Sequence, residues 1–198
     1  MKTLNISLFS ALLFDLDGTL ADTMPLHNQS WIETLKSFDC KMTNEILNEY
    51  AGIPNIKTVK LFNQRFGWSL DPELVVKKKE AKVLEKLDFV SPIESTLKIV
   101  KHYHGKKPMA IVSGGNRFLV ELILQRMMLL EYFSVLVSAE STVRGKPSPD
   151  PFLFAARELN VSPANCLVFE DGLPGIKGAQ SCGMSVVQVL ADFKLQAL

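Results

Sequence analysis

The chain has 198 residues, 47% of them hydrophobic, so it can bury one good core, or one core together with a small second module. Its 22 basic and 21 acidic residues leave a net charge of +1, which provides no strong field to attract nucleic acid or an anionic membrane. We therefore expect a small-molecule ligand, and neither a nucleic-acid nor a membrane partner.

The cysteines and the N-terminal segment bear on the cellular compartment. The cysteines are far apart and form no C-x-x-C pair: Cys40, Cys166 and Cys182. This spacing favours reduced thiols in the cytoplasm over a disulfide framework or a zinc site. The segment up to Phe14 superficially resembles a signal peptide, but polar residues interrupt it and it leads directly into a predicted core strand. We expect a cytoplasmic protein.

The first predicted strand is the apolar run 11–14, which ends in the segment Asp15-Leu16-Asp17-Gly18-Thr19. Residues two apart on a strand lie on the same face. At about 5 Å and an effective dielectric near 20, two such carboxylates repel each other by roughly 3 kcal/mol, so they need a cation or a shared proton. We expect Mg²⁺ and phosphoryl transfer here; a simple Asp-Gly turn, a calcium loop and a helix N-cap are the alternatives.

Residues 22–90 contain no convincing strand and predict a helical module inserted after the first strand. The expected helices cover residues 24–38, 43–50, 56–66 and 71–87. The segment Asp71-Pro72-Glu73 is a typical helix start. We therefore expect two domains, a catalytic core built from residues 1–21 and 91–198 and a helical cap built from residues 22–90.

After this module, short apolar runs alternate with helical stretches. The expected strands are 109–112, 135–137, 166–169 and 185–189, and the expected helices are 117–128, 150–159 with Asp150 as N-cap, and a segment from Pro174 to a stop at Gly183. Continuous apolarity is typical of strands that are buried on both faces. The alternation therefore predicts an α/β protein with a doubly wound parallel sheet, in which ligands bind at the carboxyl ends of the strands.

The two aspartates of the first motif suit complementary steps of phosphoryl transfer. Asp15 is placed to attack phosphorus and form an aspartyl-phosphate, which divides hydrolysis into two easier steps. Asp17 is placed to protonate the departing oxygen and then to take a proton from the attacking water. Gly18 permits a sharp turn, after which Thr19 offers a hydroxyl and an amide to phosphate.

Two segments at later strand ends are candidates for binding phosphate. Ser113, followed by Gly114-Gly115 and a helix, forms either an anion site or an ordinary N-cap loop. Lys146 is placed between Gly145 and Pro147, which restrict its direction, so it is a candidate for neutralising phosphate and nucleophile together. A lone lysine is more often solvated, and that alternative stays open.

The last strand end carries the acidic pair Glu170-Asp171, which completes a Mg²⁺ site with Asp15 or forms an acidic turn before a helix. Each segment is only a modest signal by itself. Because they follow successive strand ends, we expect them to meet in one crevice.

The motifs occur in the order Asp15-Leu16-Asp17-Gly18-Thr19, Ser113, Lys146 and Glu170-Asp171. In this order and over about residues 10–190, the chain resembles the phosphatases of the haloacid dehalogenase superfamily. The inserted helices resemble the cap of the β-phosphoglucomutase-like branch. Within that branch, segments 104–110 and 168–171 resemble the small bacterial fructose-1-phosphate/6-phosphogluconate phosphatases. The resemblance implies a Rossmann-like core with an inserted α-helical cap.

The resemblance also implies roles for the motif residues. The implied Mg²⁺ ligands are Asp15, the backbone carbonyl of Asp17, and Asp171, with Glu170 beside them. The implied phosphate ligands are Ser113, the amide of Gly114, and Lys146. Because the dehalogenases of the superfamily lack the second aspartate, Asp17 favours phosphate over halide chemistry.

Cap residues are implied to choose the substrate. His27 matches a histidine of the related mutases that coordinates cap closure with the second aspartate, and Lys78 approximately matches a cap lysine, although Lys77 and Lys79 leave that alignment open. Where the mutases have an arginine that grips phosphate, this chain has Asn55. A mutase needs this second anchor to hold a bisphosphate in either orientation, so its absence favours water as the acceptor.

These observations predict a Mg²⁺-dependent phosphatase that hydrolyses a small sugar phosphate or a related phosphorylated metabolite through an aspartyl-phosphate. A β-phosphoglucomutase-like phosphomutase and a catalytically silent binding or regulatory relative are the alternatives. The sequence does not identify the sugar. A monomer is expected, because no exposed heptad or unpaired strand is evident.

Overall fold

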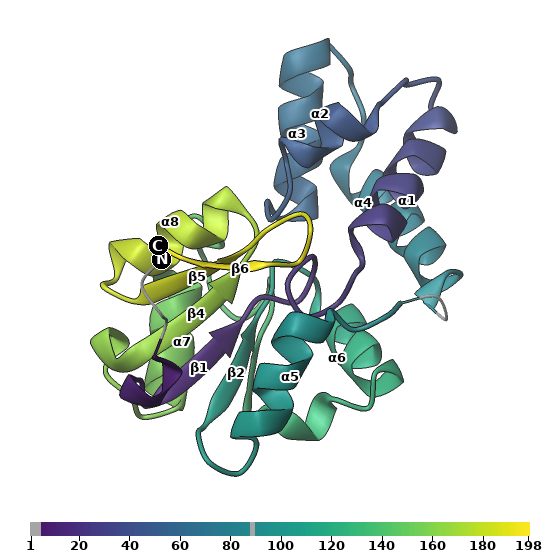
Figure 1. Cartoon of the computed structure of the whole chain (residues 1–198). Helices are drawn as coiled ribbons and strands as arrows, with labels where there is room; N and C mark the ends of the chain where they lie inside the picture. The colour runs from purple at the N-terminus through teal and green to yellow at the C-terminus, as the bar shows by residue number, and fades with distance from the viewer. Residues whose placement is uncertain (1–4, 88–89) are drawn as a thin grey trace.

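The computed structural model describes residues 5–87 and 90–198, which form a six-stranded sheet with helices on both faces and a helical group at one end (Figure 1). The strands are β1 (Ala11–Phe14), β2 (Met109–Val112), β3 (Val135–Val137), β4 (Cys166–Glu170), β5 (Ser185–Val189) and β6 (Leu195–Ala197). They lie in the order β3-β2-β1-β4-β5-β6, with β6 antiparallel to β5 and the other pairs parallel. The chain order reverses between β1 and β4, where ligands bind in sheets of this kind.

Both faces of the sheet are buried, which explains why its strands are continuously apolar. On β1, Leu12 and Phe14 belong to one core cluster, whereas Ala11 and Leu13 belong to a second cluster on the other face. Residues of α5 and α6 complete the first cluster, and residues of α7 and α8 complete the second. These helices are α5 (Glu94–Tyr103), α6 (Arg117–Arg126), α7 (Asp150–Glu158) and α8 (Leu173–Ser181). The predicted doubly wound α/β fold is confirmed.

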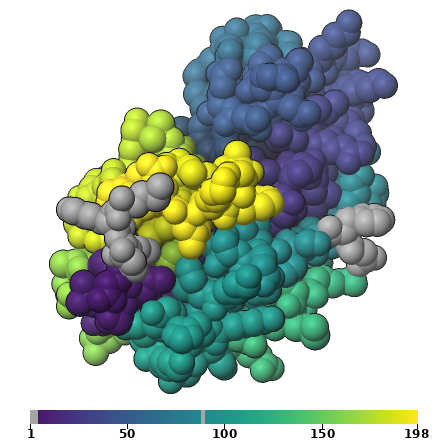
Figure 2. Space-filling view, in the orientation of Figure 1, coloured from purple at the N-terminus to yellow at the C-terminus, as the bar shows by residue number. Residues whose placement is uncertain are grey.

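Four helices between β1 and α5 form a group of their own, seen above the sheet in Figure 1 and as a separate lobe in Figure 2. They are α1 (Met24–Lys36), α2 (Asn44–Asn48), α3 (Asn55–Phe66) and α4 (Pro72–Leu84). Their shared apolar cluster includes Trp31, Leu35 and Phe62. Residues 88 and 89, near the expected end of the cap, lie outside the described residues, and the division into core and cap domains stays a prediction.

Local details differ from the expectations at several places. Asp150 is the first helical residue of α7, and Pro149 occupies the N-cap position that we expected for Asp150. Strand β6 was not expected, because its residues are all exposed and only its pairing with β5 holds it. The helix expected over 71–87 ends at Leu84. Gly183, with a φ of +78°, follows the end of α8 as expected. Among the described residues, no helix has the length and apolarity to span a bilayer.

Candidate active site

A buried lysine joins two carboxylates where β1 and β4 end. Lys146, from the loop between β3 and α7, donates from Nζ to Asp15 Oδ1 at 2.6 Å and to Glu170 Oε2 at 2.5 Å. All three side chains are buried. Burial opposes the charge of Lys146, but the two carboxylates hold its pKa above the ordinary value. Lys146, whose direction Gly145 and Pro147 were expected to restrict, therefore faces Asp15 and not solvent.

Asp171 brings a third carboxylate to this point. Asp15, Glu170 and Asp171 each offer one oxygen, and these three atoms lie within 4.8 Å of one another. Burial first, and repulsion from Glu170 second, raise the pKa of Asp171 to about 7 and that of Asp15 well above its ordinary value. One lysine does not balance three carboxylates, so this donor set of hard oxygens fits a divalent cation.

Gly18 permits the close approach of Asp171 to the first motif. Its φ is +79°, and a Cβ atom at this position would lie 2.4 Å from Asp171 Oδ2. Both the backbone conformation and the space therefore require glycine here. The pair Asp17-Gly18 forms a turn, which was the simplest alternative for this motif. The turn also makes room for the carboxylate of Asp171, the residue after β4.

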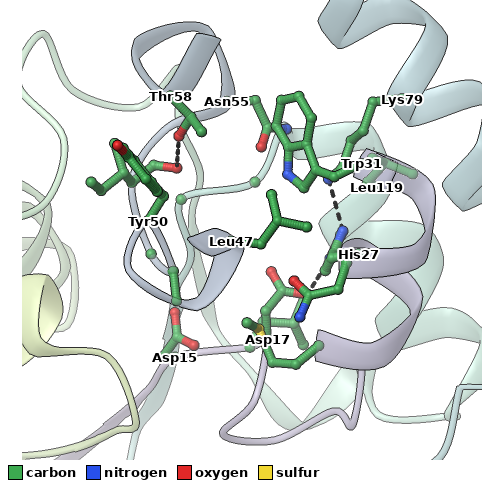
Figure 3. Close-up of a pocket in the computed structure, with 18 of the residues that line it drawn as sticks. Asp15, Asp17, His27, Trp31, Leu47, Tyr50, Asn55, Thr58, Lys79 and Leu119 are labelled. Atoms are coloured by element: carbon green, nitrogen blue, oxygen red, sulfur yellow. Dashed lines mark hydrogen bonds and ion pairs between the residues drawn. The ribbon is translucent and has the colours of Figure 1, made fainter. Parts of the chain in front are cut away.

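Asp17 has different neighbours from Asp15. Its Oδ1 accepts hydrogen bonds from Thr23 Oγ1 at 2.5 Å and from His27 Nε2 at 2.9 Å. His27 Nδ1 lies 2.8 Å from Lys79 Nζ, which completes the row of three groups in Figure 3. Burial would raise the pKa of Asp17, but His27 above all, with Lys79 farther away, holds it below the usual range. The pKa values of the two aspartates are thus shifted in opposite directions.

Lys79, and not Lys78, is the α4 lysine that faces this row. Lys79 is only 2% exposed, and burial lowers its pKa to about 8. Lys78 is exposed, with its Nζ 4.5 Å from the centre of the Phe38 ring. Adjacent helix positions point about 100° apart, so only one of these neighbours can face the cavity. Of the three cap lysines among which the alignment was open, Lys79 lines the cavity, and Lys78 is not among the described residues that do so.

Thr19 supports a carboxylate and does not face a phosphate position. It is fully buried, and its hydroxyl donates to Asp171 Oδ1 at 3.2 Å. Its amide donates to the carbonyl of Leu16 at 3.4 Å, and its carbonyl accepts from Thr96 Oγ1 at 2.7 Å. Because these groups are engaged inside the protein, the expectation that Thr19 binds phosphate is wrong.

The loop after β2 presents small residues to the cavity. Gly114 and Gly115 line it, and the Gly115 amide donates to the buried Ser113 Oγ at 3.0 Å. This contact uses the oxygen of the Ser113 hydroxyl and leaves its hydrogen available to an anion. The expected phosphate ligands Ser113 and Gly114 therefore lie at the correct strand end.

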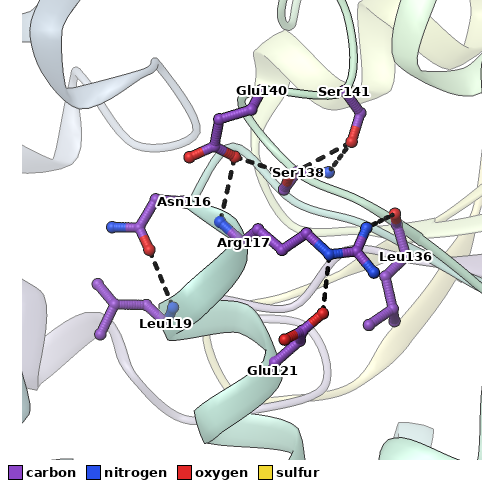
Figure 4. A network of polar contacts seen from close by, with 8 residues as sticks. All are labelled: Asn116, Arg117, Leu119, Glu121, Leu136, Ser138, Glu140 and Ser141. Atoms are coloured by element: carbon purple, nitrogen blue, oxygen red, sulfur yellow. Dashed lines mark hydrogen bonds and ion pairs between the residues drawn. The ribbon is translucent and has the colours of Figure 1, made fainter.

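Amides at the start of α6 are occupied by protein groups (Figure 4). Asn116 Oδ1 accepts from the Leu119 amide at 2.9 Å, and Glu140 Oε2 accepts from the Arg117 amide at 3.1 Å. Glu140 Oε2 also accepts from Ser138 Oγ at 2.8 Å within its own loop, so Glu140 joins the loop after β3 to the start of α6. Sequence reasoning missed Glu140, because nothing in its own segment indicates a contact with a helix 23 residues earlier.

A cavity of about 90 Å³ lies between these strand ends and the helical group. Asp15, Asp17 and Asp171 line it from the core, and Asn55, His27 and Lys79 line it from the helices. Apolar side chains of the helical group complete the wall: Met24, Trp31, Leu47, Tyr50 and Ile53. The sequence carried no signal for these wall residues, because they match ordinary core positions.

Comparison with known proteins decides the family. Residues 9–183 match the model of the haloacid dehalogenase-like hydrolases. This chain belongs to that family. It is 33% identical over 182 residues to the fructose-1-phosphate phosphatase YqaB of Escherichia coli (strain K12), which covers 91% of this chain and 96% of that protein. Over 190 residues it is 29% identical to the beta-phosphoglucomutase of Bacillus subtilis (strain 168), covering 90% of this chain and 82% of the relative.

Among solved structures, a hydrolase from Pseudomonas syringae has the same fold, with a TM-score of 0.83 at 21% identity, over 90% of this chain and 84% of that one. The expected superfamily and branch are confirmed, since both a phosphatase and a mutase of that branch are relatives. The expected class of enzyme, a phosphatase of the haloacid dehalogenase-like hydrolases, is confirmed as well.

Proposed function

We propose that this haloacid dehalogenase-like hydrolase is a Mg²⁺-dependent phosphatase that releases phosphate from a small phosphorylated sugar through an aspartyl-phosphate. The observation that carries the proposal is the convergence of Asp15, Lys146 and the Glu170-Asp171 pair at the switch point of the sheet. The relative that acts on fructose 1-phosphate supports a sugar phosphate as the substrate class.

In the first step, Asp15 attacks the phosphorus atom. Its Oδ1 is held by Lys146, and within the described residues its Oδ2 accepts no hydrogen bond, so Oδ2 is the free nucleophilic oxygen. Lys146 offsets negative charge on the nucleophile and on the phosphoryl oxygens, while Ser113 and the Gly114 amide orient those oxygens. When bound by Asp15, Asp171, Glu170 and the Asp17 carbonyl, Mg²⁺ supplies charge neutralisation and polarises the phosphoryl group.

Asp17 moves the protons of both steps. Its Oδ1 is engaged by Thr23 and His27, which leaves Oδ2 for the departing alcohol and then for the attacking water. The ionised form that its neighbours favour is the base for the second step. A phosphate dianion bound nearby raises the pKa of Asp17, which favours the protonated form that the leaving alcohol needs.

The phosphomutase alternative has weaker support. A mutase must hold a second phosphate, and no arginine is among the described residues that line the cavity. Asn55, at the position of the mutase arginine, instead contacts the carboxylate of Glu80 at 3.4 Å. The silent-relative alternative is opposed by the intact set of catalytic groups. A cytoplasmic monomer stays a prediction.

The test is phosphate release from a panel of sugar phosphates, with Mg²⁺ or with a chelator, in the wild type and in Asp15→Asn. Phosphate release should require Mg²⁺ and should fall by at least about 10³-fold in the variant, because amide nitrogen and oxygen are poor nucleophiles. Products should be screened for isomerised sugar phosphate in parallel. Isomerisation without phosphate release would support the mutase, and full activity of Asp15→Asn would overturn the proposed mechanism.

A further inference from the structure

The end of the cavity away from Asp15 has a carboxylate directly behind its wall. Asn55 on α3 lines the cavity, and Figure 3 shows it well separated from Asp15. Its Nδ2 donates to Glu80 Oε1 at 3.4 Å, and the side chain of Glu80 is half-buried on α4. A substrate group that reaches the Asn55 amide therefore comes close to a negative charge.

The positive charge at this end is already compensated. Among the described residues that line the cavity, the basic side chains are those of Lys79 and His27. Lys79 Nζ contacts His27 at 2.8 Å, and His27 contacts Asp17 at 2.9 Å, so the charge of Lys79 is directed toward that aspartate. The carboxylates of Asp17 and Glu80 both favour the charged form of Lys79. This end of the cavity therefore offers no surplus cation to a second anionic group of a substrate.

We infer that Glu80 restricts this phosphatase to monophosphates of compact, uncharged polyols and rejects substrates with a second anionic group distant from the phosphoryl group. The inference rests on the proposed function and narrows its substrate class. With the phosphoryl group at Asp15, the cavity of about 90 Å³ leaves the remainder of the substrate between apolar walls such as Trp31 and Leu47. Glu80 is not among the described residues that line the cavity, but its carboxylate lies 3.4 Å from the Asn55 amide, so it repels a distal anion at Asn55 over a short distance. A neutral sugar phosphate is therefore accepted, and a sugar-acid phosphate such as 6-phosphogluconate is disfavoured, which separates two substrates that the resemblance to fructose-1-phosphate/6-phosphogluconate phosphatases had left together.

The experiment compares two acyclic compounds that differ only at C1: sorbitol 6-phosphate, with a hydroxymethyl group, and 6-phosphogluconate, with a carboxylate. Their kcat/KM values are measured, or, for a compound that is not hydrolysed, its inhibition constant against 4-nitrophenyl phosphate. The wild type should prefer the neutral compound by about tenfold or more. Glu80→Gln should reduce this preference by about fivefold, and Glu80→Lys should reduce it further, because charge and not size distinguishes the compounds.

The matched control is Glu73→Gln, the same change of charge on an exposed residue two helical turns earlier on α4, which should leave the preference of the wild type in place. Thermal unfolding of each variant checks that it is folded. If Glu80→Gln is unstable, the comparison of the two compounds is made with Glu80→Lys instead. Equal use of both compounds by the wild type, or equal effects of Glu80→Gln and Glu73→Gln, would overturn the inference while leaving the phosphatase in place. Failure to hydrolyse any phosphate, 4-nitrophenyl phosphate included, would instead overturn the proposed function.

Discussion

Asp15 and Asp17 are two residues apart, yet their environments push their pKa values in opposite directions. Burial and the neighbouring Glu170 raise the pKa of Asp15, whereas His27 above all holds that of Asp17 down against the effect of burial. A pair of carboxylates with separated pKa values is suited to a division into nucleophile and acid/base. The proposed cation site therefore lies at Asp15, where three carboxylates come together, and not at the Asp17 side chain.

Replacement of Asp17 by Asn tests its proposed acid/base role at the residue scale. Hydrolysis of a sugar phosphate should slow by roughly 10²- to 10⁴-fold, because the alcohol then leaves without a proton. Hydrolysis of 4-nitrophenyl phosphate should slow much less, because 4-nitrophenolate is a stable leaving group. The measurement is kcat/KM for both substrates in the wild type and in Asp17→Asn, because this ratio reports the steps up to departure of the alcohol and not the second step, in which Asp17 is the base for both substrates.

The nearby Asp22→Asn is the matched control for this variant, because it makes the same chemical change outside the row of Asp17, His27 and Lys79. It should leave both rates within about twofold of the wild type, as expected for a substitution away from the reacting groups. Equal losses on both substrates in Asp17→Asn would contradict a role in protonating the leaving group and would indicate a purely structural effect.

At the scale of single elements, α4 presents consecutive residues to different surroundings. Lys78 is exposed beside Phe38, Lys79 is buried against His27, and Glu80 contacts Asn55 on α3. The rotation of α4 about its axis therefore decides which of three neighbouring charges faces the substrate. This rotation is set by packing of the helix against α1 and α3 within the apolar cluster of the helical group.

Lys79→Met should change how stability depends on pH. The pKa of Lys79 is about 8 in the folded protein, below its ordinary 10.5, because burial disfavours the charged amine. The unfolded chain therefore binds this proton more tightly, so Lys79 makes the wild type more stable as the pH rises from about 8 to about 10.5. The variant lacks this contribution. The difference in the free energy of unfolding between the wild type and the variant should therefore increase across that window by an amount on the order of 2 kcal/mol.

Urea unfolding near both ends of the pH window measures this difference. Lys78→Met is the control, because it makes the same chemical change at the neighbouring exposed position. The same pair of variants distinguishes the structural assignment from the sequence-based one, since kcat/KM on a sugar phosphate should fall in Lys79→Met and stay within about twofold in Lys78→Met. A larger loss in Lys78→Met would show that the rotation of α4 differs from the one described.

At the scale of the whole molecule, the metal candidates join segments that are distant in sequence. Asp15 follows β1, Glu170 ends β4 and Asp171 follows it, and Lys146 reaches this point from the loop after β3. In the absence of a cation, folding must bring these carboxylates together against their mutual repulsion. A bound cation should therefore stabilise the entire fold and not only the reaction.

Millimolar Mg²⁺ should raise the thermal unfolding midpoint of the wild type by a few degrees, equivalent to about 1–3 kcal/mol, because only the folded protein gathers the ligands. Asp171→Asn should lose most of this shift. Differential scanning calorimetry with Mg²⁺, and with NaCl at equal ionic strength as the control, measures it. An equal shift in the wild type and in Asp171→Asn would argue against Asp171 as a ligand.

Several features were determined by the sequence alone. The continuous apolar run 11–14 and the similar runs later in the chain are local signals of strands buried on both faces, and the parallel sheet follows from their alternation with helices. The polar residues that end these runs converge because parallel strands expose their carboxyl ends on one side. Asp15, Lys146 and Asp171 were therefore predictable as neighbours, and the structure brings them together.

Only the tertiary structure decided which side chains face the cavity and which support it from behind. The choice of Lys79 over Lys78 depends on the rotation of α4, and the use of the Thr19 hydroxyl depends on the approach of Asp171. Glu80 and Glu140 gained their partners from elements far away in sequence. The physical reason is that burial and turn preferences act within a few residues, whereas the direction of a polar side chain depends on contacts that packing creates.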